Sequence, residues 1–320
     1  MPAAILERAR SGAVPMPVSL TCPACEAPMK GPVGGFRFEC RRCGCFRSTL
    51  PIAIDADRIT DRGDEAAFDA AIASTRERNF DIVLDRLQRY VPAQGARLLE
   101  VGCAYGSFLA AAARRGYVAF GIEPDAARAT RAMGIVAGDG TVWSGYFPAD
   151  LPHGQRFHAI VFNDVFEHLP DPLSAARALP ALLHDGGVVA INLPNCTGIF
   201  FRVADVLRRI GVSGPHDRLW QIGFPSPHLS YFQPDALAKL LERAGFRERE
   251  RRNLQTLSIG ELWPRLRYNN RMPVAALRLI WLGVVVASPL LAVLPADISL
   301  QIFDRRSDDA RASRGATGAS

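Results

Sequence analysis

The sequence lacks several features that define whole classes of protein. Its 320 residues contain no internal repeat, and 48% of them are hydrophobic while 22% are charged. This composition excludes a fully disordered chain, a collagen and a coiled coil. The first 20 residues contain no apolar run long enough for the core of a signal peptide. We therefore expect a cytoplasmic globular protein.

Cysteines are scarce outside one short segment. Five of the seven fall between Cys22 and Cys45, whereas Cys103 and Cys196 stand alone in apolar stretches. A secreted protein held by disulfides would spread its cysteines along the chain and would usually contain an even number. The distribution therefore indicates a reducing compartment.

The clustered cysteines form two Cys-x-x-Cys pairs, Cys22 with Cys25 and Cys40 with Cys43. Four thiolates at this spacing can surround Zn²⁺ tetrahedrally. The segment also has too few apolar residues to fold by burial alone, and metal binding would supply folding free energy. We predict a zinc-ribbon-like module with a structural zinc ion. An iron site, a redox pair, and Cys45 in place of Cys43 are the alternatives.

Strand-like and helix-like patterns alternate in the middle of the chain. The predicted strands are 97–101, 118–122, 135–137, 159–162 and 187–193. The predicted helices are 65–90, 108–115, 124–133, 172–183 and 234–244. This alternation is typical of a parallel sheet with helices on both faces. We predict an α/β, doubly wound, mostly parallel sheet with a small N-terminal zinc-knuckle module.

A loop of small residues follows the first strand of this region. Gly102, Ala104 and Gly106 let the backbone pass close to a ligand. Glu123, at the end of the next strand, can accept two hydrogen bonds from a ribose diol. Glu100 suits a cationic ligand and would repel a pyrophosphate. This carboxylate disfavours a nicotinamide-dependent oxidoreductase, and tight strand–helix packing is the non-functional alternative.

The chain resembles class I S-adenosylmethionine-dependent methyltransferases over about residues 80–255. The resemblance rests on LLEVGCAYG after the first strand, GIEPD after the second, FHAIVFNDVFEHLPDP around the fourth, and GGVVAINLPN in the fifth. It implies a Rossmann-like fold that binds S-adenosyl-L-methionine, and Ala104 departs from the glycine common in the family. The resemblance further implies four sets of cofactor contacts: the methionine side with Glu100, Gly102, Ala104 and Gly106; the ribose hydroxyls with Glu123; the adenine amine with Asp139, placed after the third strand; and the amino-acid end with Asn163.

Asp164, Glu167 and His168 follow the fourth strand at helical spacing, so a helical turn would put them on one face. The ending EHLPDP resembles the quinone O-methyltransferases, in which the matching acid, Glu and His bind a divalent ion near the phenol substrate. This resemblance implies a divalent cation at the three residues. The alternative is that Glu167 and His168 merely tie the loop together.

His228 precedes an aromatic residue and a helix on what the resemblance implies is the acceptor side of the cleft. A histidine with a pKa near neutrality can take a proton from a hydroxyl as the methyl group arrives. We therefore predict His228, His168 and Glu167 as catalytic residues and expect His216 and Trp220 to shape the same pocket. The predicted acceptor is a small molecule, sugar or lipid-linked molecule, methylated on a hydroxyl oxygen. A loop histidine bonded to the backbone is the alternative.

A basic stretch and an apolar stretch separate two last strands predicted at 249–256 and 298–304. Residues 239–278 contain ten bases and four acids, and residues 274–295 are almost wholly apolar. Arg278 and Pro289 interrupt the apolar stretch, whereas a membrane span needs roughly 20 uninterrupted apolar residues. We expect an insertion that contacts an anionic membrane surface peripherally, at the inner face. A helical lid or a dimer surface is the alternative.

The sequence is therefore divided into four predicted parts: a flexible arm at 1–20, the zinc-ribbon-like module at 21–60, the methyltransferase domain at 61–304 with its insertion at about 257–297, and a disordered tail at 305–320. A non-catalytic scaffold that binds the cofactor or a nucleic acid is a further alternative. Nucleic acid is not an expected partner, because the module offers only Phe36, Phe38 and Phe46 for stacking bases.

Overall fold

The computed structural model describes residues 20–52, 62–136, 138–254, 259–267, 272–291 and 294–306. The predicted arm and tail lie almost entirely outside these ranges. In chain order the elements are β1 (Lys30–Val33), β2 (Arg37–Glu39), β3 (Phe46–Ser48), α2 (Arg62–Leu87), β4 (Arg97–Val101), α3 (Ser107–Arg114), β5 (Val118–Glu123), α4 (Ala126–Met133), β6 (Thr141–Ser144), β7 (Phe157–Asn163), the 3₁₀ turn η2 (Phe166–His168), α5 (Pro172–Leu182), β8 (Leu183–Pro194), α6 (Ile199–Arg209), α7 (Gly214–Leu219), β9 (Ser230–Tyr231), α8 (Pro234–Arg243), β10 (Phe246–Leu254), α9 (Ile259–Arg267), α10 (Val274–Leu291) and β11 (Ile298–Arg305).

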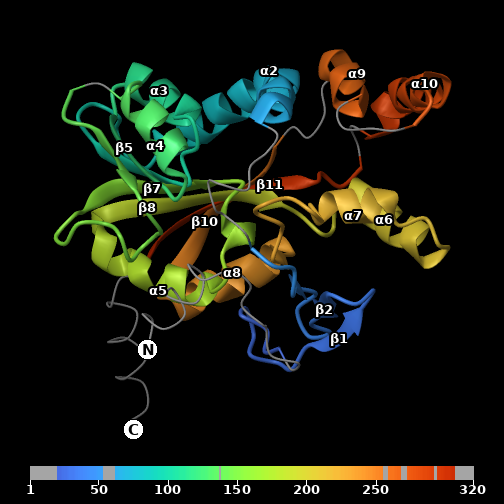
Figure 1. Ribbon diagram of the computed structural model, residues 1–320. Helices are drawn as coiled ribbons and strands as arrows, with labels where there is room; N and C mark the ends of the chain where they lie inside the picture. Colours follow the sequence, from blue (N-terminus) through green and yellow to red (C-terminus); the bar gives the residue numbers. More distant parts are fainter. Residues whose placement is uncertain are drawn as a thin grey trace, which may run out of the picture.

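A seven-stranded sheet forms the centre of the molecule, in the order β10-β11-β8-β7-β4-β5-β6. The strands from β8 to β6 are parallel, and β11 runs antiparallel to both of its neighbours. Helices α2, α3 and α4 cover one face, and α5 and α8 cover the other (Figure 1). The predicted doubly wound, mostly parallel sheet is confirmed.

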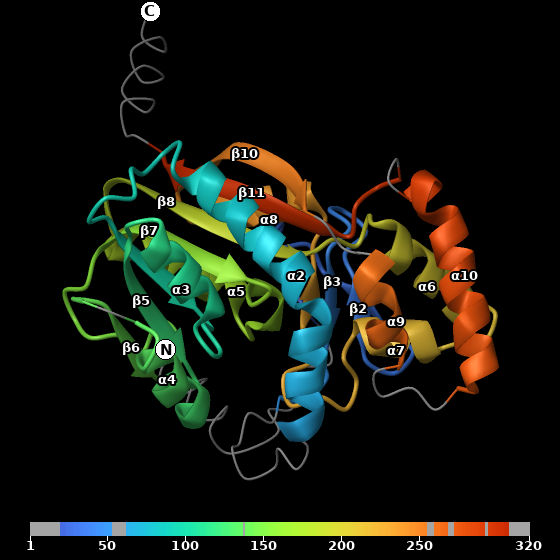
Figure 2. The same cartoon turned by 90° about the horizontal axis from the view of Figure 1, so that it is seen from above.

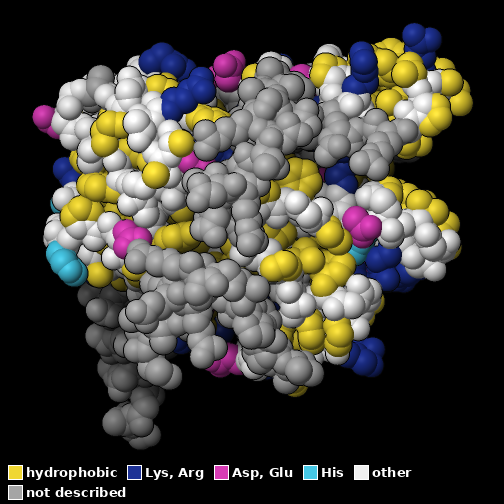
Figure 3. Space-filling view, in the orientation of Figure 1, with side chains coloured by type: hydrophobic (Ala, Val, Ile, Leu, Met, Phe, Trp, Pro, Cys, Tyr) yellow, Lys and Arg dark blue, Asp and Glu magenta, His cyan; other side chains and the backbone are white. Residues whose placement is uncertain are grey.

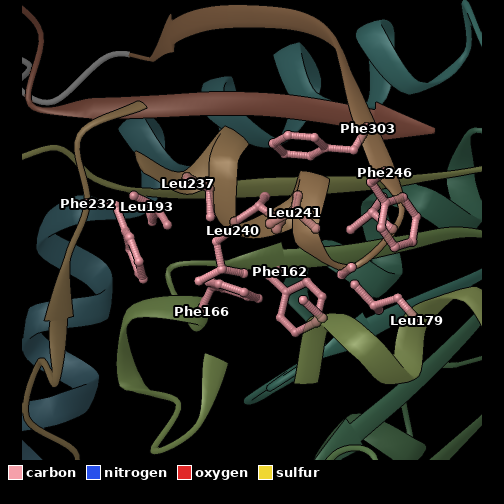
Figure 4. Packing of buried hydrophobic residues seen from close by; sticks show 14 of the residues in the cluster. Phe162, Phe166, Leu179, Leu193, Phe232, Leu237, Leu240, Leu241, Phe246 and Phe303 are labelled. Carbon is pink, nitrogen blue, oxygen red and sulfur yellow. The ribbon is translucent and has the colours of Figure 1, made fainter. Parts of the chain in front are cut away.

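Apolar side chains fill both spaces between the sheet and the helices, because the parallel strands are buried on both faces. Figure 4 shows the layer under α8, where Leu237, Leu240 and Leu241 meet Phe162 and Phe303 of the sheet. Each of these side chains is fully buried. Burying one such side chain stabilises the fold by about 1.5–3 kcal/mol, so this layer holds α8 against the sheet.

The third parallel strand lies later in the chain than predicted. The structure places β6 at Thr141–Ser144, whereas the sequence pattern favoured 135–137. Val142 is buried and pairs with Gly121 of β5, but Ile135 is 41% exposed just after the end of α4. Contacts with the neighbouring strand, rather than local hydrophobicity, therefore select the strand.

A second, four-stranded sheet carries the cysteine module, in the order β1-β2-β3-β9. Its fourth strand, β9, comes from the methyltransferase part of the chain and pairs with β3 through Phe46 with Tyr231 and Arg47 with Ser230. The two predicted domains therefore share a sheet. The module lies beside α7, at the lower right in Figure 1.

Two helices occupy the predicted insertion between β10 and β11. The two strands form the expected antiparallel hairpin, which closes with Leu254 opposite Ile298. Helix α9 packs on α2, where Glu261 accepts hydrogen bonds from Ser74 and Thr75. Helix α10 follows at the edge of the molecule (Figure 2). Among the described residues, no helix has both the length and the apolar character needed to cross a membrane.

Candidate cofactor and acceptor site

The loop after β4 is built from left-handed backbone. Gly102, Ala104 and Gly106 have φ angles of 70°, 45° and 81°. A Cβ added to Gly102 would lie 2.7 Å from a methyl group of Val165, so only glycine fits there. Ala104 adopts the left-handed conformation despite its Cβ, which costs roughly 1–2 kcal/mol. Such strain in a close-packed turn is typical of a ligand-binding loop.

Glu123 closes this loop from the end of β5. Its two carboxylate oxygens accept hydrogen bonds from the backbone N–H groups of Ala104, at 2.9 Å, and Asp125, at 3.1 Å. Burial raises the pKa of Glu123. The carboxylate is thus fixed beside the loop, and its remaining lone pairs can accept bonds from a diol.

Glu100 is a buried acid with one unpartnered oxygen. Its side chain is 4% exposed, Oε1 accepts a bond from Asn163 Nδ2 at 2.8 Å, and Oε2 has no hydrogen-bond partner among the described residues. Asn192 donates in turn to Asn163 Oδ1 at 2.8 Å, which fixes the amide. Burial raises the pKa of Glu100 to about 8. A cationic ligand would satisfy this carboxyl group.

Asp139 does not lie where the sequence predicts. It is exposed in the turn that precedes β6, at the amino end of the parallel strands, because the third strand begins after it. Glu123 and the loop lie at the carboxyl end. Glu123 is level with Ser144 across the two strands, so sequence reasoning missed Ser144 and the following Gly145 and Tyr146. The available signal was the β-branched and aromatic residues of the TVWS segment, which favour a strand.

Arg76 was also missed. It lies on α2 and is half-buried, within electrostatic range of Glu100 and Asp164. Its neighbours Ser74 and Thr75 bind Glu261 of α9. A segment that the sequence predicted only as a helix at 65–90 therefore brings a cation near Glu100 and Asp164.

Glu167, His168 and His228 meet in one buried cluster. Glu167 is 1% exposed, and neither of its carboxylate oxygens has a hydrogen-bond partner among the described residues. Its Oε1 lies 3.9 Å from His168 Nε2 and 4.0 Å from His228 Nε2. The two imidazole rings are 4.7 Å apart. The three predicted catalytic residues therefore lie together.

The outer bonds of the two imidazoles indicate which nitrogen holds the proton. Tyr231 donates its hydroxyl hydrogen to the carbonyl of Leu219 at 2.8 Å, so His228 Nδ1 must donate to that hydroxyl oxygen at 2.9 Å. His168 Nδ1 faces the carbonyl of Pro227 at 2.9 Å and must also donate. In the neutral rings, both Nε2 lone pairs consequently face Glu167.

Burial shifts the ionisation of all three groups toward their neutral forms. It lowers the pKa of His168 to about 4 and the pKa of His228 well below its ordinary value. Burial, followed by the charge of Asp164, raises the pKa of Glu167 well above its ordinary value. In these neutral forms, two acceptor nitrogens lie beside a carboxyl group whose proton is the one donor among the three.

Asp164 is not part of this cluster. Its φ angle is 52° and its side chain is exposed, because the helical turn begins only at Phe166. The helical spacing that placed it beside Glu167 and His168 does not apply. Apart from the four cysteines, one group of possible metal ligands among the described residues has its ligand atoms within 4.8 Å of one another. It consists of Glu167, His168 and His228.

The four predicted zinc ligands lie together in the small module. Cys22 Sγ and Cys43 Sγ are 3.4 Å apart, as are Cys25 Sγ and Cys40 Sγ, and all four sulfur atoms lie within 4.8 Å. Tetrahedral zinc–sulfur bonds place sulfur atoms about 3.8 Å apart, so the donor set fits the ion. Cys45 instead donates to the carbonyl of Phe46.

The module holds the loops that carry both histidines. Arg47 is buried and donates to the carbonyl of Pro170, at 2.7 Å, and to Ser230 Oγ, at 2.6 Å. Ser48 Oγ donates to the carbonyl of His228 at 2.8 Å. Sequence reasoning missed these residues because nothing in the sequence predicted the pairing of β3 with β9.

His216 and Trp220 lie behind the site rather than at its surface. Both are buried, and the Trp220 ring packs 4.8 Å from Tyr231 and 5.7 Å from Phe36 of the module. They support the tyrosine that holds His228.

Comparison with known proteins gives the family. A family model described as a methyltransferase domain matches residues 73–250, more than half of the chain. The chain belongs to this family, and the predicted class is confirmed.

Curated relatives include ubiquinone biosynthesis O-methyltransferases. That of Xylella fastidiosa is 30% identical over 170 residues, which cover 51% of this chain and 65% of the relative. That of Xanthomonas campestris is 32% identical over 127 residues, covering 38% and 53%. The chain thus spans between half and two thirds of the length of these relatives.

Among solved structures, a putative methyltransferase from Haloferax volcanii, in complex with a methyltransferase activator, superposes with a TM-score of 0.52. The identity is 14%, and the match covers 78% of this chain and 98% of that one. The likeness concerns the fold alone.

Proposed function

We propose that this protein transfers a methyl group from S-adenosylmethionine to a hydroxyl oxygen of a small-molecule, sugar or lipid-linked acceptor. The observation that carries the proposal is Glu100, a buried carboxyl with one unpartnered oxygen beside a left-handed loop. A sulfonium or ammonium group would stabilise its carboxylate form, whereas the pyrophosphate of a nicotinamide cofactor would keep it protonated and gain no such attraction.

Different residues of the chain would contact different parts of the cofactor. Glu100, Gly102, Ala104 and Gly106 would line its methionine side, with Asn163 orienting Glu100, and Arg76 is a candidate for its carboxylate. Glu123 would hold the ribose hydroxyls. Ser144, Gly145 and Tyr146 replace Asp139 as candidates for the adenine, because they follow the strand next to Glu123. The cofactor would supply an activated methyl group.

The Glu167–His168–His228 cluster would receive the proton of the acceptor. The cofactor would supply the methyl group and leave as S-adenosylhomocysteine, and an Nε2 lone pair facing Glu167 would accept the hydroxyl proton of the acceptor. Glu167 in its ionised form would then stabilise the imidazolium. Most of the rate enhancement would come from positioning the two reactants in line. The names of the relatives, O-methyltransferases of ubiquinone biosynthesis, support a hydroxyl acceptor.

A divalent cation is the second candidate for the same cluster. Two imidazole nitrogens and a carboxylate form a suitable donor set for Zn²⁺, Mn²⁺ or Fe²⁺. This set contains His228 in place of the expected Asp164. Turnover that EDTA abolishes and added metal restores, in protein that keeps its cysteine-bound zinc, would support the cation. Turnover unchanged by EDTA would leave the proton-accepting role.

Methyl-labelled S-adenosylmethionine tests the proposed transfer. Purified protein is incubated with phenols, sugar nucleotides or a lipid extract. We expect the label in a methyl ether that resists alkaline hydrolysis, together with S-adenosylhomocysteine. His228→Asn keeps a hydrogen bond to Tyr231 but removes the Nε2 base, so we expect about a 10²-fold loss of kcat, as is typical of general base catalysis. Label recovered only in ester, amine or carbon-linked products would contradict an oxygen acceptor.

A further inference from the structure

We propose that α6 and α10 together form a docking surface for anionic lipid membranes. This inference deepens the proposed function by naming the partner beside its acceptor site. The surface consists of the outer face of α6, the loops around α7, and α10. Figures 1 and 2 both place α6, α7, α9 and α10 at the same end of the molecule. Arg218 of the α7 region donates to the carbonyl of Arg265 on α9 at 3.5 Å, which joins the two halves.

Helix α6 carries apolar side chains on its solvent-exposed side as well as on the side that packs inward. Phe201 and Ala204 face inward and are buried, but Val203, Val206 and Ile210 are 47%, 57% and 71% exposed. Val212, Ile222 and Phe224 extend this apolar surface around α7 and are also exposed. A contiguous patch of large apolar side chains is a mark of an interaction site, because water contact with it is unfavourable.

Helix α10 presents even more apolar surface. Leu277 is its one buried large apolar residue among those described, whereas Leu279, Leu282 and Val286 are 71%, 52% and 72% exposed. The helix has no acidic residue and is too short and too interrupted to span a bilayer. A helix of this kind can lie in the interface of a membrane with its side chains among the acyl chains.

The charges around the patch identify the partner as anionic. Elements α6, α7, α9 and α10 carry seven arginines: Arg202, Arg208, Arg209, Arg218, Arg265, Arg267 and Arg278. Of their three acids, Asp205 is bonded to arginines and Glu261 is buried against α2. Figure 3 shows the apolar side chains over α6 and α10 with basic side chains beside them. Arg202, Arg218, Arg267 and Arg278 are exposed, and each such base near an anionic surface would contribute about 1 kcal/mol of attraction.

The same charges argue against a second copy of the chain as the occupant. A twofold dimer places the same patch of each copy against the other, so the arginines of the two copies would face one another. Like charges at such an interface are unfavourable. Anionic headgroups above an apolar interior complement both properties of the surface.

The surface lies one layer of side chains from the acceptor cluster. Phe201 of α6 packs 4.8 Å from the ring of Tyr231, which holds His228. A protein bound to a membrane through α6 would therefore meet a lipid-linked acceptor close to the residues proposed to receive its proton.

Vesicle sedimentation tests this inference with the full chain. We expect binding to vesicles of equal parts phosphatidylcholine and phosphatidylglycerol at low salt, and at least tenfold weaker binding to pure phosphatidylcholine. Salt near 1 M, which shortens the Debye length to about 3 Å, should weaken binding at least tenfold. Absence of binding to the anionic vesicles at low salt would overturn the proposal.

Two pairs of substitutions locate the surface. Val206→Glu with Ile210→Glu, and Leu279→Glu with Leu282→Glu, should each reduce vesicle binding at least tenfold. Ile135→Glu, an exposed apolar residue after α4, is the matched control and should bind like the unchanged protein. Binding that survives both pairs would overturn the surface, as would a dimer in solution that either pair dissociates.

S-adenosylhomocysteine titration of the same variants separates this inference from the proposed function. All of these variants should retain the affinity of the unchanged protein, which shows that they fold. Vesicle binding without cofactor affinity in the unchanged protein would contradict the proposed function alone, and cofactor affinity without vesicle binding would contradict the docking surface alone.

Discussion

Glu100 carries the charge argument for a cationic ligand, because it is a buried acid with a raised pKa and an unpartnered oxygen. With a pKa of about 8, the free protein holds this carboxyl mostly protonated at neutral pH. A bound cation stabilises the carboxylate and lowers that pKa. Binding should therefore release a proton, and the affinity should rise with pH until about pH 8, where the free carboxyl is already ionised.

Glu100→Gln tests this linkage at a single residue. Glutamine can still accept the bond from Asn163 Nδ2 but cannot ionise, so the proton release at pH 7 should disappear. We also expect about a 10- to 100-fold loss of affinity for S-adenosylmethionine, the cost of losing a hydrogen bond to a charged group. Calorimetry in two buffers with different ionisation enthalpies measures both. Equal proton release in the variant and the unchanged protein would assign the release to another group.

Single residues were predictable where the backbone follows a regular element. Glu100 and Glu123 lie in strands, so their positions at one edge of the sheet follow from the strand pattern. Asp139 and Asp164 lie in turns, and both predictions failed there. The left-handed φ of Asp164 and the late start of β6 depend on packing, which the sequence does not display.

At the scale of elements, the joining of β3 to β9 links the cysteine module to the acceptor cluster. Arg47 is the main side-chain connection, since its buried guanidinium bonds both the loop after His168 and Ser230. A module attached in this way would position the two histidines without touching a ligand. Its contribution should therefore concern the acceptor and not the cofactor.

Arg47→Lys should separate the two halves of the site. Lysine retains the charge but not the two-armed geometry, so one of the two loops loses its bond. We expect a rise of tenfold or more in the acceptor KM and a changed pH profile of kcat, with S-adenosylhomocysteine affinity within twofold. Arg41→Lys, on an exposed arginine of the same module, is the matched control. Equal losses of cofactor and acceptor binding would indicate general destabilisation instead.

The main elements could be predicted because their periodicities are long and strong. The parallel strands β4, β5 and β7 and the hairpin of β10 with β11 lie close to their expected ranges. Helices α6 and α7 and the two-residue strand β9 were not predicted. Partners distant in the sequence define them, such as Asp297, which accepts a bond from the N–H of Phe200 at the start of α6.

At the scale of the whole molecule, we expect the core-poor cysteine module to depend on a bound zinc ion, and the acceptor cluster to depend on the module. Only a few side chains of the cysteine module, such as Leu20, Met29 and Phe38, are buried and apolar. Metal binding would supply the missing folding free energy. The spacing predicted that the four cysteines lie together, but not that the module contacts the loops of the two histidines.

Replacing zinc ligands tests this dependence. We expect purified protein to contain one zinc ion per chain, measured by atomic emission, and Cys25→Ser with Cys40→Ser to contain less than a tenth as much. The variant should lose turnover while it still binds S-adenosylhomocysteine, because the loop of Glu100 lies in the other sheet. Cys103→Ser, outside the module, is the control for thiol loss in the zinc measurement alone, because Cys103 lies in the loop of Gly102 and Ala104. Full zinc content in the variant would refute the assigned ligands.

Calorimetric titration of the purified protein with S-adenosylhomocysteine, with NADH as the competitor cofactor, tests whether this chain binds the methyl donor. We expect micromolar affinity for S-adenosylhomocysteine, no heat from NADH, and at least a tenfold loss of affinity in Glu123→Ala, which cannot bind a ribose diol. Affinity for NADH without affinity for S-adenosylhomocysteine would contradict the proposed methyl transfer, and an unchanged affinity in Glu123→Ala would contradict the role of Glu123.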